Sequence, residues 1–224
     1  MEFGQQVRDA ALVSLQVDGG PVQVIATGAF GGKPHFSADP NLVYVRQAAG
    51  LSSVDLSNGE IKPAVNVQGP NWYFAESLAQ VDDSRLSPEG KWVLAIIAQQ
   101  AHVVAAPAPG QVVDLLNPAR EHRRITDVGA DFIEWADGGK TITWSVGSTF
   151  YRRSLADIKL NPANSPSWSA DAPKRGVEAF QAVVEVPRDE PGGNLVLRGA
   201  RAITMRDSEV IENADVLISD GRIA

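Results

Sequence analysis

Three stretches of similar sequence decide the fold: Phe36-Ser-Ala-Asp-Pro-Asn-Leu-Val-Tyr-Val45, Leu86-Ser-Pro-Glu-Gly-Lys-Trp-Val-Leu-Ala95 and Trp135-Ala-Asp-Gly-Gly-Lys-Thr-Ile-Thr-Trp144. Each starts with an apolar residue, continues through a polar turn, and ends in a run typical of a β-strand. The residues after the leading apolar one are 37, 87 and 136, so the copies lie 50 and 49 residues apart. This spacing matches the blades of a β-propeller, which are roughly 40 to 50 residues long.

The apolar pattern of the strand in the middle copy supports this interpretation. Trp92, Leu94 and Ile96 would lie on one face of the strand, and Val93, Ala95 and Ile97 on the other. A strand that is apolar on both faces belongs to a sheet covered on both sides, as in a propeller blade. The third copy has Thr141, Thr143 and Ser145 on one face, which predicts a less deeply covered blade, as at an end of the array.

Other strand-like runs surround the copies at even spacing, which is typical of an all-β protein. They cover residues 22–27, 64–67 and 124–127 before the copies and 51–56, 102–106 and 149–155 after them. Residues 11–17 resemble the outer strand of a further, incomplete blade. The predicted fold is therefore all-β: a partial β-propeller of about three four-stranded blades plus an incomplete one, followed by a small β-sandwich segment.

Proline and glycine divide the chain into three parts. Residues 1–158 are predicted to form the partial propeller, residues 159–193 a linker with one strand at 177–186, and residues 194–224 the start of a β-sandwich. Within the last part, the pair Asp220-Gly221 between apolar runs is a strong signal for a two-residue hairpin turn. Closed propellers have about four to eight blades, so we expect the chain to be a fragment of a larger protein.

The composition excludes several classes of protein. The hydrophobic content of 44% and the charged content of 21% are ordinary for a soluble globular chain. A net charge of −7 argues against nucleic acid or an anionic membrane as partner. The chain has no cysteine, no apolar run near the roughly 18 to 20 residues of a membrane span, and an N-terminus unlike a signal peptide. These features leave the compartment open.

Two family resemblances follow from these motifs. The three Ser-Pro-Glu-Gly-Lys-like copies, within residues 11–158, resemble the WD40-like repeats of TolB-like propellers, a motif that says little about function. Residues 194–224, including Leu197-Arg-Gly-Ala-Arg-Ala-Ile-Thr204 and Val210-Ile-Glu-Asn-Ala-Asp-Val-Leu-Ile-Ser219, look like the opening strands of the amidohydrolase superfamily. The chain departs from that family at Asp207-Ser208, where glycine is more usual.

The second resemblance implies a metal-dependent hydrolase whose barrel domain would follow this chain. The family holds a divalent metal, zinc by expectation, with a His-x-His pair, and acts on amide or amidine C–N bonds. The only histidines here are His35, His102 and His122. Because none is near another in sequence, no metal ligand or catalytic residue can be carried over, and no cofactor is expected in this chain itself. The resemblance also suggests a periplasmic or secreted protein.

Few residues stand out as candidates for a site. Trp72, Tyr73 and Phe74 lie in a long connection, residues 66–84, and are the best candidates for a contact surface. A second long connection covers residues 107–123. The histidines are interpreted as polar strand or core residues. The basic run around His122 is interpreted as a solvated face, and the alternative is that it binds an anion. Turn chemistry accounts for most of a set of acidic residues that could otherwise be calcium ligands, Asp82, Asp83, Asp127, Asp131 and Asp137.

The favoured function is the non-catalytic propeller portion of a metal-dependent amidohydrolase, with this chain inactive by itself. Its partners would be its own C-terminal barrel domain and a small-molecule or peptide substrate of the whole enzyme. The alternative is a TolB-like propeller that binds proteins or peptides without enzymatic activity. A propeller that gates a serine peptidase is a third option, but Ser87 and Ser148 lack the Gly-x-Ser-x-Gly elbow.

Overall fold

The computed structural model describes residues 8–70, 78–165, 175–187 and 192–224. The described residues form β-strands and two short 3₁₀ segments, η2 (Asp137–Gly139) and η3 (Leu155–Asp157). The chain divides into two compact units, Met1–Ala182 and Val183–Ala224. None of the described helical segments is both long enough and apolar enough to cross a membrane. The prediction of an all-β chain is confirmed.

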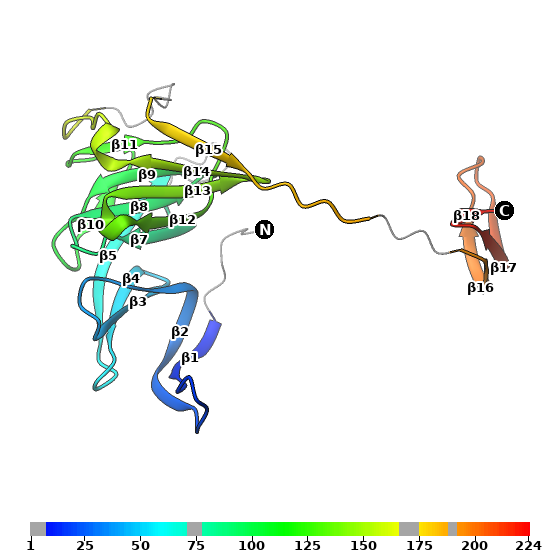
Figure 1. The fold of residues 1–224 in the computed structure, drawn as a ribbon, viewed down its shortest axis with the longest axis horizontal. Coiled ribbons are helices and arrows are strands. Elements are labelled where there is room, and N and C mark those ends of the chain that lie inside the picture. The colour runs from blue at the N-terminus through cyan, green and yellow to red at the C-terminus, as the bar shows by residue number, and fades with distance from the viewer. Residues whose placement is uncertain (1–7, 71–77, 166–174, 188–191) are drawn as a thin grey trace. The chain divides into compact units, whose positions relative to one another are not determined.

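The first unit starts with an incomplete blade, which we call the half-blade. It consists of β1 (Arg8–Ser14) and the first half of β2 (Gln23–Phe36), paired antiparallel. The end of β2 then pairs with β3 (Leu42–Gln47), followed by β4 (Gly50–Asp55) and β5 (Ile61–Pro70). The end of β2 with β3, β4 and β5 is blade 1, and the first sequence copy spans the hairpin between β2 and β3 (Figure 1).

Blade 2 is a four-stranded antiparallel sheet built around the second copy. Its strands are β7 (Asp83–Leu86), β8 (Trp92–Ile97), β9 (Gln100–Ala105) and β11 (His122–Arg124), in the order β11-β9-β8-β7. Residues 93–97 are all buried, so both faces of β8 are covered as its sequence predicts.

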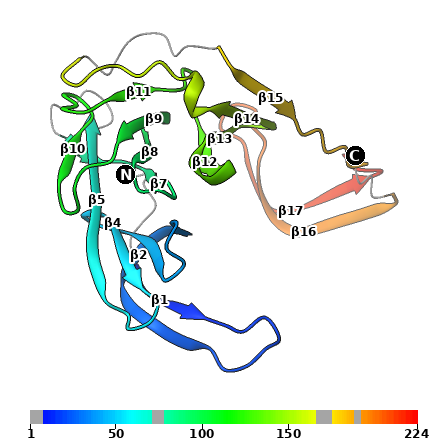
Figure 2. The same ribbon diagram turned by 60° about the vertical axis from the view of Figure 1, so that its left-hand side comes forward.

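Blade 3 repeats this arrangement around the third copy. It contains β12 (Asp131–Ala136), β13 (Thr141–Val146), β14 (Thr149–Ser154) and β15 (Val177–Gln181), paired in that order. The strand expected within the linker is therefore the fourth strand of this blade, and it is shorter than the predicted 177–186. Blades 2 and 3 are separate four-stranded sheets, whereas the half-blade and blade 1 share β2 and belong to one seven-stranded sheet. This series of sheets agrees with the predicted partial propeller (Figure 2).

The two long connections contain short strands that were not predicted. β6 (Leu78–Gln80) pairs antiparallel with the end of β5, and β10 (Val112–Asp114) pairs parallel with Asn66–Gln68 of β5. The described strands of both connections therefore extend the sheet of blade 1.

The hydrophobic core lies between successive blades in three clusters. The half-blade and blade 1 share one around Val43 and Val54, and blades 1 and 2 share another around Leu51 and Val93. Blades 2 and 3 share the third, which contains Leu94, Ile96, Ile133, Ile142 and Trp144. Stacking of adjacent blades thus buries the apolar faces that the repeated sequence creates.

The second unit is a three-stranded antiparallel sheet. It contains β16 (Asn194–Ile203), β17 (Val210–Ser219) and β18 (Arg222–Ile223). Asp220 and Gly221 join the last two strands with φ angles of 49° and 72°. These left-handed angles are those of a type I′ hairpin, so the predicted turn is confirmed. The described residues of this unit form one sheet, where a sandwich would need two.

Candidate functional site

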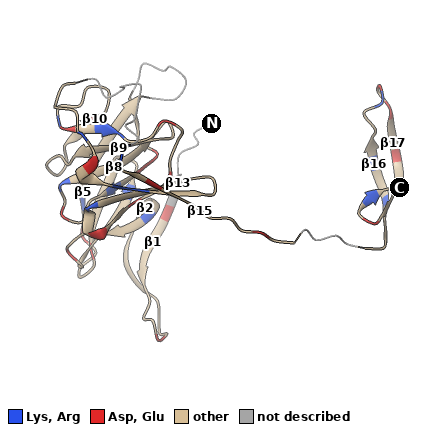
Figure 3. Ribbon diagram, turned by 45° about the horizontal axis from the view of Figure 1, so that its top comes forward, with Lys and Arg blue, Asp and Glu red and all other residues tan. Residues whose placement is uncertain are grey.

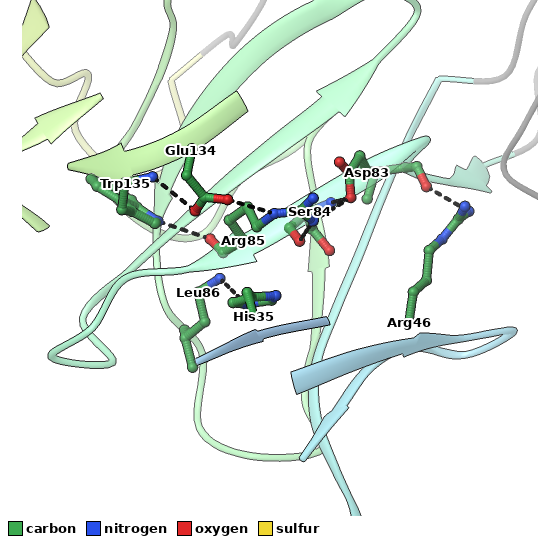
Figure 4. A network of polar contacts seen from close by, with 9 residues as sticks. His35, Arg46, Asp83, Ser84, Arg85, Leu86, Glu134 and Trp135 are labelled. Atoms are coloured by element: carbon green, nitrogen blue, oxygen red, sulfur yellow. Dashed lines mark hydrogen bonds and ion pairs between the residues drawn. The ribbon is translucent and has the colours of Figure 1, made fainter. Parts of the chain in front are cut away.

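Equivalent positions of the three sequence copies meet where the blades adjoin. His35, Arg85 and Glu134 each directly precede the leading apolar residue of a copy. The backbone N–H of Leu86 donates to Nε2 of His35 at 3.2 Å, and Nε of Arg85 donates to Oε2 of Glu134 at 3.3 Å. Trp135 Nε1 also donates to the carbonyl oxygen of Arg85 at 3.1 Å (Figure 4). The repeat thus joins the inner strands of blades 1, 2 and 3.

Arg85 is the centre of this network. Its side chain is only 3% exposed and bridges two carboxylates, Asp83 on its own strand and Glu134 on blade 3. It also donates to the carbonyl oxygen of Ser84 at 2.9 Å. A buried guanidinium is tolerated only when its charge and its donors are matched in this way. Arg85 therefore fixes the ends of β7 and β12 relative to each other.

His35 lies on the blade 1 side of the same network. Its ring is buried and stacks on Tyr44, with centroids 5.4 Å apart. Burial, and then the positive charge of Arg85, lower the pKa of His35 to about 4. The ring is therefore neutral at pH 7, and its Nε2 accepts the bond from Leu86.

A cleft of about 520 Å³ opens beside Arg85. It lies where β7 and β12 begin, and Gln99 in the β8–β9 turn and Lys33 on β2 complete its wall. Segments of blades 1, 2 and 3 therefore contribute to one hollow. Its charged lining consists of Asp82, Asp83, Asp131, Glu134, Lys33 and Arg85.

Phe132 projects an aromatic ring at the edge of this cleft. The residue has a φ of 52° and lies where the register of β12 against β13 shifts, between Asp131 and Glu134. A positive φ is rare for a bulky side chain and is typical of a bulge that redirects it. The side chain is 68% exposed, and the ammonium of Lys33 lies 4.6 Å from the ring centroid. The bulge thus presents the ring to the cleft rather than to the core.

Asp82 is the most desolvated free carboxylate of the cleft. Burial raises its pKa, the charge of Arg46 opposes this, and the neighbouring Asp83 adds to it. The Asp82 backbone N–H donates to the carbonyl oxygen of Ile96. The charge of Arg46 is therefore the main favourable influence on the ionised form of this carboxylate.

The acidic residues of the sequence analysis have different roles. Asp137 accepts from Thr141 at 2.6 Å in the β12–β13 connection, and Asp127 pairs with Arg124 at 2.6 Å, so these two are local structural groups. Asp83 lies in β7 and neutralises the buried Arg85, so it is not a turn residue, whereas Asp82 lies in the bend before β7 and lines the cleft. Across the first unit, acidic and basic positions are interspersed along the strands (Figure 3).

The basic run around His122 does not form a solvated face, which corrects the sequence interpretation. His122 is 1% exposed, and its Nδ1 lies 2.8 Å from the carbonyl oxygen of Arg120. Arg120, Arg123 and Arg124 are half-buried, because β11 pairs with β9 on one side and Asn161 pairs with His122 on the other. Arg123 accordingly donates to the side chain of Asn161 at 2.6 Å.

The histidines do not converge on one site. His102 pairs with Arg124 across β9 and β11, and burial lowers its pKa to about 3, whereas His35 lies between blades 1 and 2. In the described ranges, no group of three or more histidine or carboxylate side chains is placed to hold a metal ion. The predicted contact surface of Trp72, Tyr73 and Phe74 lies outside the described residues.

Sequence reasoning did not single out Lys33, Arg85, Phe132 or Glu134. Arg85 and Glu134 could have been recognised from the repeat, because each directly precedes the leading apolar residue of its copy. The sequence does not indicate that Phe132 is exposed, because its exposure results from the bulge between Asp131 and Glu134.

The solved structures that are similar to this chain include two propeller-type proteins. One is to a structure described as "putative TolB from Agrobacterium tumefaciens", with 13% identity, a TM-score of 0.33, and coverage of 90% of this chain and 87% of that one. The other is to dihydro-heme d1 dehydrogenase NirN in complex with DHE, with 13% identity and a TM-score of 0.30. That match covers 63% of this chain, which spans 39% of the NirN structure. No protein-family profile and no curated protein matches the chain. The fold assignment therefore rests on the sheet topology.

Proposed function

We propose that the chain is a propeller-type binding module that holds a peptide segment of a partner protein in the cleft beside Arg85, without enzymatic activity of its own. The observation that carries the proposal is the cleft itself. Its volume of about 520 Å³ lies within the roughly 300 to 1,000 Å³ of typical ligand sites.

The construction of the cleft suits binding. Arg85 and its two carboxylate partners fix β7 and β12, so the walls are held before a ligand arrives. A preorganised site loses less conformational entropy on binding. The accessible lining is mainly charged, since Ile96 and Ile133 beneath it are buried, and Phe132 offers a large exposed ring. Aromatic residues of this kind are common anchors of protein interfaces.

The experiment is a titration of the ¹⁵N-labelled chain with heptapeptides of the frame acetyl-Gly-Ser-Leu-Xaa-Leu-Ser-Gly-amide, with Xaa varied. We expect at least one peptide to shift amide signals of residues 82–85, 96–99 and 130–134. Phe132→Ala should weaken this binding about tenfold, because loss of an aromatic anchor costs 1 kcal/mol or more. Phe150→Ala is the matched control, since Phe150 is 44% exposed but lies on β14 and does not line the cleft. Absence of binding by every peptide, or shifts confined to other regions, would refute the proposal.

The second candidate is the propeller portion of a metal-dependent amidohydrolase. What supports it is the sequence resemblance of residues 194–224 together with the separate three-stranded sheet that these residues form. The described residues do not fit a divalent metal, because no group of three or more histidine or carboxylate side chains among them is placed to hold one, and the three histidines are buried. Zinc and the catalytic groups would therefore have to come from a barrel domain encoded after Ala224. A coding sequence that continues into a His-x-His motif supports this candidate, and zinc-dependent amide hydrolysis by the present chain contradicts it.

A further inference from the structure

One asparagine of the sequence is directly followed by glycine, in the pair Asn58-Gly59. The pair lies in the turn between β4 and β5. An asparagine in this position is chemically labile, because the backbone nitrogen of the next residue can attack Cγ of the side chain. Glycine has no Cβ and leaves the approach to that nitrogen open. Asn58 is exposed, so water and hydroxide reach its amide.

Two hydrogen bonds hold the reacting groups apart in the folded turn. The N–H of Gly59 donates to the carbonyl oxygen of Asp55 at 2.7 Å, so the attacking nitrogen keeps its proton. Oδ1 of Asn58 accepts the N–H of Glu60 at 2.8 Å, which ties the side-chain amide to the residue beyond Gly59. Attack of the nitrogen on Cγ therefore requires both bonds to open.

Further contacts keep this turn closed. The carboxylate of Asp55 accepts the N–H and the hydroxyl of Ser57, at 2.8 and 2.6 Å, and Nδ2 of Asn58 at 3.5 Å. Gly59, with a φ of 74°, lies so close to β2 that a Cβ would clash with the carbonyl oxygen of Ile25. Opening of the turn thus breaks its internal bonds and moves it away from the half-blade.

We propose that Asn58 is a deamidation site that reacts when the β4–β5 turn opens. The backbone nitrogen of Gly59 gives its proton to solvent base and bonds to Cγ of Asn58, and Nδ2 leaves as ammonia. The product is a cyclic succinimide. One water molecule then opens the ring, and attack at its two carbonyl groups gives aspartate or isoaspartate. The net reaction consumes water and releases ammonia, and it needs no other reactant.

The product prevents the turn from closing again. The new carboxylate lies beside Asp55, whose carboxylate accepted a bond from the lost amide and now meets a like charge. In isoaspartate the main chain also gains a methylene group before Gly59, where the close approach to Ile25 leaves no room for a shift. Deamidation therefore converts a transient opening into a lasting loss of contact between blade 1 and the half-blade.

The test follows Asn58 by peptide-mapping mass spectrometry during incubation at pH 8. It compares the full chain with the peptide acetyl-Asp-Leu-Ser-Asn-Gly-Glu-Ile-amide, which copies residues 55–61. We expect the full chain to react about tenfold or more slowly, because a turn with these contacts is open for a small fraction of the time. If the full chain reacts as fast as the peptide, the turn does not protect Asn58 and the proposal is wrong.

A pair of variants tests whether this turn controls the reaction. Asp55→Ala should raise the rate in the full chain about fivefold relative to a peptide with the same substitution, which corresponds to the loss of one hydrogen bond. Asp114→Ala is the matched control. Asp114 accepts the N–H of Leu116 at 2.7 Å and Nδ2 of Asn117 at 3.4 Å in the same pattern, but after β10. Equal acceleration by both variants, or no deamidation in Asp55→Ala, would overturn the proposal.

The effect on the half-blade is measured on the wild-type chain and does not depend on the folding of a variant. Deamidated and unmodified chains are separated by ion exchange, since the product carries one more negative charge. We expect the amides of Ile25 and Ala26, beside the turn, to exchange hydrogen faster in the deamidated chain. Equal exchange in the two forms would show that the modified turn still closes on β2, which contradicts the proposed consequence.

Discussion

His35 shows how one side chain can couple blade stacking to pH. Its Nε2 accepts the N–H of Leu86, and this bond joins blade 1 to blade 2. The bond requires a neutral acceptor at Nε2, and burial lowers the pKa of His35 from 6.5 to about 4. The unfolded chain therefore binds more protons than the folded chain between these pH values. Stability from His35 is complete above pH 6.5 and is lost as the pH falls toward 4.

We predict that His35→Gln reduces the pH dependence of the unfolding free energy by about one proton between pH 6.5 and 4. Glutamine can offer an oxygen to Leu86 but does not titrate. The measurement is urea unfolding at several pH values followed by tryptophan fluorescence, which reports on the first unit because all five tryptophans lie between residues 72 and 168. His102, with a pKa of about 3, adds its own slope to both proteins. Equal slopes in the wild type and the variant would contradict the prediction.

The sequence predicts where Arg85 and Glu134 lie in the repeat better than it predicts which residues they contact. The leading apolar residues Leu86 and Trp135 lie at the ends of β7 and β12, so the positions before them can be recognised from the repeat. That Arg85 bridges to Glu134, and that His122 is buried, depends on which blades and connections pack together. Such contacts join residues that are distant in sequence, and local patterns do not record them.

The β4–β5 hairpin illustrates how an element is constrained by its neighbours. Its turn contains Gly59, with a φ of 74°, and a Cβ at this position would clash with the carbonyl oxygen of Ile25 on β2. Gly90, in the β7–β8 turn, has nearly the same φ of 72°, but a Cβ there meets no atom within 4 Å. Both glycines therefore have a left-handed backbone, but only at Gly59 would a side chain also clash with a neighbouring strand.

We predict that Gly90→Ala costs about 1 kcal/mol, because only the left-handed backbone opposes it. Gly59→Ala should cost roughly 2 to 4 kcal/mol, since the backbone of β2 must also move. The comparison needs only the urea midpoints of the two variants at pH 7. Equal costs would mean that the close approach of the β4–β5 turn to β2 is absent in solution.

Strands and turns whose residues form a recognisable local pattern were predicted correctly from the sequence. The middle copy predicted a strand that is apolar on both faces, and Asp220-Gly221 predicted the β17–β18 turn with its positive φ angles. The parallel pairing of β10 with β5 was not predicted, because its three residues carry no periodic pattern. A strand this short forms only where a neighbouring edge offers unpaired backbone groups.

Across the whole array of blades, the face that blade 2 packs against blade 3 is apolar, and the equivalent face of blade 3 is polar. Leu94 and Val103 of blade 2 are cross-strand partners that pack toward blade 3. The equivalent pair in blade 3, 49 residues later, is Thr143 and Arg152. Arg152 pairs with Asp137 at 2.9 Å and with Glu178 at 3.6 Å. This face of blade 3 therefore carries polar and charged side chains where blade 2 has apolar ones. Thr141 and Thr143 on this face are nevertheless buried, so the expectation of a less deeply covered face does not hold for them.

We predict that restoring the blade 2 pattern on this face makes the chain associate with itself. The variant carries Thr143→Leu, Ser145→Ile and Arg152→Val, which copy the equivalent residues Leu94, Ile96 and Val103. A contiguous apolar face of this kind favours contacts between copies, so sedimentation velocity over a dilution series should show larger, concentration-dependent species than the wild type does.

The control for this experiment keeps the polarity of the face with Thr143→Ser, Ser145→Thr and Arg152→Lys, and it should sediment as the wild type does. A folded, apolar variant that sediments like this control would contradict the prediction. It would mean that Arg152 and its two carboxylate partners do not protect the end of the blade array from association. Far-ultraviolet circular dichroism of both variants distinguishes this result from unfolding, because each folded chain retains the β-signal of its blades.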